Sequence, residues 1–413
     1  MLIVQKFGGT SVANLEAIRR VGQRALQTKN DGNQVVVVLS AGAGETDSLF
    51  KLAAAITSEP DPRECDALVG LGEQKSVALL GLYLKSLQIP CVSLNALQVP
   101  IVTDDSHGKA RILTIDPSRI RDELEKGKIV IVTGYQGVTE AGDLTTLGRG
   151  GSDTSAVALA LSLKADLCEI YTDVDGVYTA DPKKVEHPEL LKKISYEEMM
   201  ELADAGAKVL HPRCVELGAK GGLKLKVRSS FHEGEGTEVV SEEASLEKIL
   251  VAGVTLNTKE AKVSIRRIPS TPGVLAKFFA PLAKAGINID MIVENLGKDG
   301  TTDLAFTVAK EDLRATLKYA ESVAKKLNAG KVEAASDIAK ISMVGLGMRS
   351  HAGVAYRIFQ ILDDLNITIQ MVTTSEIKVS LVVNLEEADR AVKGLHEALV
   401  GAGGEARGRD AEK

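Results

Sequence analysis

The chain has 413 residues, which is too long for one core of ordinary size, so two or three domains are expected. Its formal net charge of -6, and the absence of tryptophan among few aromatic residues, argue against a nucleic-acid partner. The four cysteines are scattered without a CxxC pair, which is typical of reduced thiols in a cytoplasmic protein. The sequence starts as a strand, MLIVQKFGG, without the basic and long apolar segments of secreted or membrane proteins.

Short apolar runs alternate with helical periodicity through residues 1–231. Strands are expected at 2–6, 34–39, 91–94, 128–134, 167–172 and 223–229, and helices at 12–28, 63–87, 152–164, 196–204 and 208–219. This alternation predicts an α/β fold, a three-layer αβα sandwich with a mostly parallel sheet. Ligands in such folds bind at the carboxyl ends of the strands, where residues 6–10, 40–46 and 143–155 are expected.

A glycine-rich stretch at residues 143–155, DLTTLGRGGSDTS, follows a predicted buried strand and opens a predicted helix. Its glycines allow close approach of backbone to a ligand, and the start of a helix attracts anions. Arg149 adds a planar group suited to a carboxylate or phosphate. An ordinary helix cap at Ser152 would explain part of the pattern. The density of small and polar residues favours a polar ligand site.

The composition changes after residue 231. Residues 232–248 are polar and acidic, and we expect a linker there. An approximate βαββαβ repeat follows, with one copy at 261–337 and a second at 340–405 that lacks its last strand. We expect residues 249–256 to supply this missing edge strand, and residues 406–413 to form a tail. The expected domains are therefore a catalytic domain at 1–231, a linker and two smaller repeat domains.

Several motifs in order resemble the aspartate kinases of the amino-acid kinase superfamily. They are KFGGTSV at 6–12, the SAxxGxT-like segment at 40–46, Gly72-Glu73, TTLGRGGSDT at 145–154 and TDVDGVYTADP at 172–182. The repeat is similar to the paired ACT domains of the same enzymes, each a ferredoxin-like fold. The resemblance implies ATP-dependent phosphorylation of the β-carboxylate of L-aspartate to 4-phospho-L-aspartate, for lysine, threonine and methionine biosynthesis.

This chemistry suits the residues present. A carboxylate acceptor, with a reference pKa of about 3.9, is ionised at neutral pH and requires no general base. Phosphoryl transfer then needs positioning and positive charge, for which Lys6 is the candidate, assisted by the backbone of Gly8 and Gly9. The resemblance implies that Asp153 is the second catalytic residue, which orients Lys6 or helps to hold Mg²⁺ carried by ATP. The alternative for Asp153 is an acid that favours the first turn of a helix.

The resemblance also assigns the remaining site residues. Arg149 would bind the α-carboxylate of aspartate and Glu73 its α-ammonium group. Further aspartate or phosphate contacts are implied at Ser40, Thr46, Gly150, Gly151 and Ser152. The nucleotide contacts implied are Lys6, Phe7, Gly8, Gly9, Thr172, Asp173, Tyr178, Lys183 and Lys208.

Paired ACT domains imply feedback control and a homodimer. Threonine is the expected effector, alone or together with lysine, and Ser270 stands where we expect an acid in relatives inhibited jointly by lysine. The effector positions implied by the resemblance are Gly273, Asn288, Asp290, Asn366, Ile367, Ser375 and Glu376. Two alternatives remain at this point, a kinase for another amino acid such as glutamate or acetylglutamate, and a non-catalytic amino-acid sensor.

Overall fold

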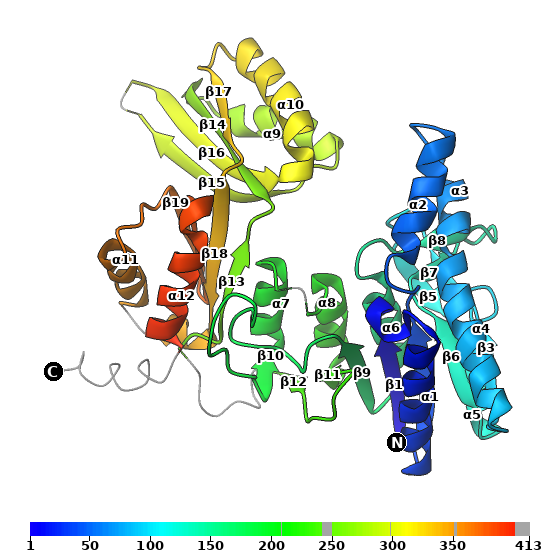
Figure 1. Ribbon diagram of the computed structural model, residues 1–413. Helices are drawn as coiled ribbons and strands as arrows, with labels where there is room; N and C mark the ends of the chain where they lie inside the picture. Colours follow the sequence, from blue (N-terminus) through cyan, green and yellow to red (C-terminus); the bar gives the residue numbers. More distant parts are fainter. Residues whose placement is uncertain (208, 242–249, 298, 351–352, 401–413) are drawn as a thin grey trace. The chain divides into compact units, whose positions relative to one another are not determined.

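The computed structural model (Figure 1) describes residues 1–207, 209–241, 250–297, 299–350 and 353–400. These residues form two compact units. The first unit contains Met1–Tyr178, Leu190–Asp204 and the described residues between 209 and 241. The second contains Thr179–Glu189, Ala205–Ala207 and the described residues from 250 onward. Because the chain crosses repeatedly between them, neither unit is one continuous stretch of sequence.

An eight-stranded sheet forms the centre of the first unit, in the order β10-β12-β11-β9-β1-β2-β6-β3. The strands are β1 (Leu2–Phe7), β2 (Gln34–Leu39), β3 (Cys91–Leu94), β6 (Ile129–Thr133), β9 (Leu167–Thr172), β10 (Lys193–Ser195), β11 (Leu225–Ser229) and β12 (Thr237–Val240). Neighbouring strands run parallel, except that β12 runs antiparallel to β11. The carboxyl ends of β1, β2, β6 and β9 therefore lie at one edge, as the sequence predicts.

Helices cover both faces of this sheet. The helices of the first unit are α1 (Leu15–Asn30), α2 (Glu45–Ile56), α3 (Pro62–Val69), α4 (Leu71–Ser86), α5 (Ser118–Glu125), α6 (Gly151–Leu163), α7 (Tyr196–Asp204) and α8 (Pro212–Gly221), of which α2 packs mainly on α3. On one face, Ile18 of α1 and Leu80 of α4 pack on Val37 and Ile131. The opposite face, toward which Lys6 points, packs against α6, and α8 packs against α6 in turn. The predicted three-layer α/β fold is confirmed.

Two features of the first unit were not predicted. A small sheet in the order β5-β4-β7-β8 contains β4 (Ile101–Thr103), β5 (Ile112–Ile115), β7 (Gln136–Val138) and β8 (Leu144–Thr146). Moreover, the expectation of a linker throughout 232–248 is wrong, because Thr237–Val240 form β12 in the main sheet. The side chains of Thr237 and Val239 are buried there, and β12 pairs with both β10 and β11. Polar composition concealed this short alternating strand.

The second unit contains two antiparallel four-stranded sheets. The first has the order β15-β16-β14-β17, with β14 (Glu260–Pro269), α9 (Val274–Lys284), β15 (Ile289–Leu296), β16 (Thr301–Ala309), α10 (Leu313–Lys326) and β17 (Val332–Ala335). The second has the order β13-β18-β20-β19, with β13 (Gly253–Asn257), β18 (Ile338–Val344), α11 (Val354–Asp364), β19 (Met371–Thr374), β20 (Lys378–Asn384) and α12 (Ala388–Leu399). The sequence repeat therefore corresponds to two structural modules.

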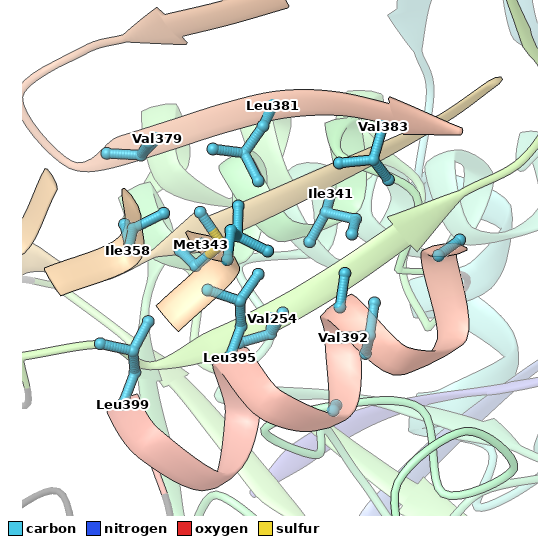
Figure 2. Packing of buried hydrophobic residues seen from close by; sticks show 14 of the residues in the cluster. Val254, Ile341, Met343, Ile358, Val379, Leu381, Val383, Val392, Leu395 and Leu399 are labelled. Atoms are coloured by element: carbon cyan, nitrogen blue, oxygen red, sulfur yellow. The ribbon is translucent and has the colours of Figure 1, made fainter. Parts of the chain in front are cut away.

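The second module has a core that combines three parts of the chain. Figure 2 shows Leu395 and Leu399 of α12 facing the strands of the sheet, which contribute Ile341 of β18 and Val254 of β13 to the same core. The edge strand β13 pairs with β18, so the segment before the first repeat does complete this sheet. The same core contains Ala180 and Val185, which come from the segment Thr179–Glu189. No described helix combines the length and the apolar character that crossing a membrane requires.

Candidate active site

A buried ion pair joins the end of β1 to the first turn of α6. The Nζ atom of Lys6 lies 2.6 Å from Oδ1 of Asp153, and both side chains are about nine-tenths buried. Lys6 lies in the parallel ladder between β2 and β9, and Asp153 is the third residue of α6. Among the described residues, Asp153 Oδ1 has no hydrogen-bond partner beyond this ionic contact. The pair therefore offers a fixed positive charge and a partly unsatisfied carboxylate at the carboxyl edge of the sheet.

The loops after β1 and β2 contact each other closely. A Cβ atom on Gly9 would lie 2.9 Å from the carbonyl oxygen of Ala41, and Ala43 N–H donates to the carbonyl of Gly9 at 3.1 Å. The N–H of Gly8 donates to the carbonyl of Tyr171 and extends the contact between β1 and β9. The role of Gly8 at a phosphate therefore stays a prediction, and in this structure its N–H donates to the backbone of β9.

Glu73 approaches the same loops from α4. Its Oε1 accepts the N–H of Ala41 at 3.0 Å, while Oε2 is buried without a hydrogen-bond partner among the described residues. The preceding residue must be small, because a Cβ atom on Gly72 would lie 2.6 Å from that of Ala41. Burial raises the pKa of Glu73 to about 7. A cationic ligand group would satisfy Oε2 and favour the ionised form.

The glycine-rich loop leads into α6, as expected. Gly150 has the left-handed φ of +67° and the helix begins at Gly151, so Ser152 and Asp153 occupy its first turn. Ser152 is buried and Arg149 is exposed. Ser40 lies in the loop after β2, Thr46 lies in the first turn of α2, and Phe7 is the last residue of β1. The structure thus brings the predicted aspartate-site residues to one edge of the first unit.

The predicted nucleotide residues are only partly brought together. Thr172, Asp173 and Tyr178 lie in the first unit at and after the end of β9. Lys183 is exposed and belongs to the second unit. Lys208 lies outside the described residues. Of the predicted nucleotide residues after β9, the first unit therefore contains Thr172, Asp173 and Tyr178.

Three further residues at this edge escaped the sequence analysis. Asp175 accepts hydrogen bonds from the Tyr178 hydroxyl and contacts His232 Nδ1, each at 3.2 Å. His211 caps α8 and packs directly against Gly150. Tyr135 has a positive φ of 67° at the turn after β6, where its ring lies against Gly151. A non-glycine residue in this conformation often marks a functional region, but the sequence itself shows only a tyrosine after a glycine.

The predicted effector residues lie in both modules of the second unit, in turns next to helices or strands and at the start of a strand. Gly273 caps α9 with φ +80°, and Asn288 directly precedes β15. Asp290 forms an ion pair with Lys340, which also contacts Glu260 at 2.6 Å. In the second module Asn366 follows α11 with φ +52°, and Glu376 lies 3.2 Å from Arg349. Ser375 is exposed, whereas the side chain of Ile367 is buried in the core.

Comparisons with known proteins define the class of this molecule. Residues 1–229 match the amino acid kinase family, and residues 263–322 and 341–399 match an ACT domain. The chain belongs to the amino acid kinase family.

Similar proteins narrow this assignment. An aspartate kinase of Pseudomonas fluorescens is 50% identical over 401 residues, which cover 96% of this chain and 97% of the relative. Escherichia coli aspartokinase III in complex with aspartate and ADP (R-state) is 26% identical, with a TM-score of 0.81 over 97% of this chain and 100% of that chain. Its complex with lysine and aspartate (T-state) gives a TM-score of 0.75 at 26% identity, over 97% and 99% of the two chains. Within the family, the chain is therefore one of the aspartate kinases.

Proposed function

We propose that the chain transfers the γ-phosphoryl group of ATP to the β-carboxylate of L-aspartate at the edge formed by β1, β2 and α6. The observation that carries this assignment is the buried Lys6–Asp153 pair at the start of α6. Lys6 supplies positive charge to the transferred phosphoryl oxygens, and the N-terminus of α6 adds to it. The acceptor carboxylate is already ionised at neutral pH, so no protein base takes a proton from it.

Magnesium fits this site as a companion of ATP. The described residues contain no cluster of three or more His, Cys, Asp or Glu that could hold a metal ion by itself. Mg²⁺ is commonly held by one or two carboxylates together with substrate phosphates, and Asp153 provides such a carboxylate. When bound, the metal would neutralise charge on the phosphates, while Asp153 keeps Lys6 oriented.

Aspartate is held by charges at both ends in this proposal. Glu73 accepts the α-ammonium group through its unpartnered Oε2, and Arg149 binds the α-carboxylate. Ser40, Thr46, Gly150, Gly151 and Ser152 complete the contacts. Thr172, Asp173 and Tyr178 contact ATP together with Phe7, Gly8, Gly9 and Lys208. The E. coli neighbour with aspartate and ADP supports these ligand classes.

The test is ATP consumption by the purified chain with Mg²⁺ and aspartate, glutamate or acetylglutamate. We expect turnover with aspartate, and a loss of at least about 100-fold in kcat for Lys6→Met, because a preorganised charge at the transferred group is removed. Lys51→Met, on the exposed surface of α2, is the matched control. Turnover with another acceptor, or near-normal kcat in Lys6→Met, would contradict the assignment.

Feedback control through the ACT modules is part of the proposal. Threonine, alone or with lysine, binds a homodimer at Gly273, Asn288 and Asp290 of the first ACT module and at Asn366, Ile367, Ser375 and Glu376 of the second. The E. coli structure with lysine supports an amino-acid effector in this class. The reaction would then begin the biosynthesis of lysine, threonine and methionine. The proposed division is a catalytic unit that includes β12, Thr237–Val240, and excludes Thr179–Glu189, with ACT domains at 261–337 and at 249–256 plus 340–405.

Inhibition curves with threonine, lysine and both test this part. We expect Asn288→Ala to raise the half-inhibiting concentration of threonine about 10-fold, because a polar contact to a buried effector is worth roughly 1.4 kcal/mol. Asn295→Ala, at the other end of β15, is the control. Threonine binding without any turnover would instead indicate a sensor.

A further inference from the structure

Two charged side chains from different helices form hydrogen bonds with the glycine-rich loop. Asp66, on α3, is 1% exposed and accepts hydrogen bonds from the N–H and the hydroxyl of Thr146, at 3.1 and 2.6 Å. Arg213, in the first turn of α8, donates to the carbonyl oxygen of Leu147 at 3.1 Å. Asp66 therefore accepts hydrogen bonds from the loop, whereas Arg213 donates one to a carbonyl oxygen of the loop.

Both residues also bind one neighbouring stretch, residues 107–110, which we call the support segment. Asp66 accepts from Gly108 N–H at 2.9 Å and contacts His107 Nδ1 at 2.9 Å. Arg213 donates to the carbonyl oxygen of Ala110 at 3.0 Å. The support segment and the loop share a backbone hydrogen bond, from Ala110 N–H to the carbonyl of Thr146 at 2.9 Å. Each charged residue thus bridges the same two segments.

The loop needs such support because of its own conformation. Gly148 and Gly150 have φ values of +75° and +67°, and glycine populates many other conformations at little cost. A Cβ atom on Gly148 would lie 3.1 Å from the carbonyl oxygen of Gly108, so the loop rests directly on the support segment. Burying charged groups costs free energy that an apolar packing would avoid, and such groups can specify one conformation in return.

We propose that Asp66 and Arg213 are positioning residues that hold residues 146–150 in the conformation that binds aspartate. The inference depends on the proposed function, in which Arg149 and the backbone of Gly150 contact that substrate. Neither residue needs to touch the substrate. Their loss lets the loop shift relative to Lys6 and Asp153, and displacement by about 1 Å can cost on the order of 100-fold in rate.

Steady-state kinetics of Asp66→Asn and Arg213→Lys test the proposal. Asp66→Asn places an amide nitrogen, itself a donor, where the N–H groups of the loop and the support segment need an acceptor. Arg213→Lys replaces the planar guanidinium group, which donates to two carbonyl oxygens, with a single ammonium group. We expect each variant to raise the KM for aspartate about 10-fold, while the KM for ATP changes less than about 2-fold. The double variant should show less than the product of the two effects, because both residues hold one loop.

Arg63→Gln is the matched control. Arg63 also lies on α3, and it forms an exposed ion pair with Asp143 at 2.6 Å, ahead of the same loop. Such exposed pairs contribute little, so we expect less than about a 2-fold change in either KM. A purely structural role would lower the unfolding temperature of Asp66→Asn or Arg213→Lys and leave the KM for aspartate unchanged, which would overturn the proposal.

Limited trypsin digestion gives a readout that needs no activity. Arg149 is exposed, so its peptide bond reports how freely the loop opens. We expect cleavage after Arg149 to be about 10-fold faster in Arg213→Lys than in the wild-type chain, and aspartate to slow it in the wild type. Equal cleavage rates would contradict the proposal. A wild-type chain that neither turns over aspartate nor is protected by it would instead refute the proposed function.

Discussion

The two oxygens of Glu73 have different surroundings. Oε1 accepts the N–H of Ala41, and Oε2 is buried without a protein partner in the described part of the chain. Burial raises the pKa of Glu73 to about 7, so this carboxyl group changes its charge within the physiological range. Only the ionised form attracts an ammonium group. Substrate binding and protonation at this residue should therefore oppose each other.

The KM for aspartate should consequently depend on pH. We expect it to fall several-fold as the pH rises from 6 to 8 through the pKa of about 7, because the fraction of ionised Glu73 increases. Glu73→Gln should raise the KM at pH 8 and remove most of this dependence. Kinetics at fixed saturating ATP measure it, with the exposed Glu64→Gln as control. An unchanged profile in Glu73→Gln would show that another group is responsible.

The starts of α6 and α8 meet at one close contact. A Cβ atom on Gly150 would lie 2.2 Å from Cγ of His211, the residue that caps α8. Burial lowers the pKa of His211, although the negative charge of Asp153 opposes this. The neutral imidazole thus fits against the loop without adding a second positive charge beside Lys6.

Gly150→Ala tests this contact between two helices. The left-handed φ costs an alanine roughly 1–2 kcal/mol, and overpacking against His211 adds roughly 1–3 kcal/mol. Gly142→Ala is a matched control, because Gly142 has φ +90° and open space around its Cα. Denaturant unfolding should therefore show a larger loss for Gly150→Ala than for Gly142→Ala. His211→Ala in the Gly150→Ala background should recover part of the difference, and equal losses would contradict the steric account.

The elements of the fold differ in how well the sequence predicts them. The buried apolar runs of β1, β2, β6 and β9 predict the parallel sheet, and the glycine turn after β1 predicts Lys6. The roles of Glu73 and Asp153 follow from the family resemblance. The strand β12 is short and lies in a polar segment, so its pairing depends on neighbours distant in sequence. Asp66 and Arg213 occupy ordinary positions on helices. Their roles come from loops that only the tertiary structure brings beside them.

The two compact units are each built from several segments that alternate along the chain. The segment Thr179–Glu189 directly follows Tyr178, a proposed nucleotide contact, yet it belongs to the second unit. Ala180 and Val185 are buried in the core of the second ACT module. The Thr179 hydroxyl contacts His396 Nε2 of α12 at 2.9 Å, and its carbonyl accepts from Val254 N–H at 2.8 Å.

Lowering the pH should destabilise the folded chain, because the buried His396 beside Thr179 resists protonation. Burial lowers its pKa, against the opposing charges of Glu189 and Glu397. The unfolded chain, with a histidine pKa of about 6.5, therefore binds a proton that the folded chain resists, and stability falls as the pH decreases below that value. We expect His396→Gln to lose less unfolding temperature between pH 7.5 and 5.5 than the wild type. The exposed His187→Gln is the control, and identical losses in all three chains would contradict the prediction.

The segment Thr179–Glu189 determines what would happen if the ACT modules were removed in evolution or in metabolic engineering. Deleting the ACT modules would leave Ala180 and Val185 in water and Thr179 without its partners, so a shortened gene would encode an incomplete hydrophobic core rather than an unregulated enzyme. The ACT modules are therefore difficult to remove by truncation. If they bind an effector as proposed, variants that no longer respond to it should carry substitutions that preserve the ACT scaffold.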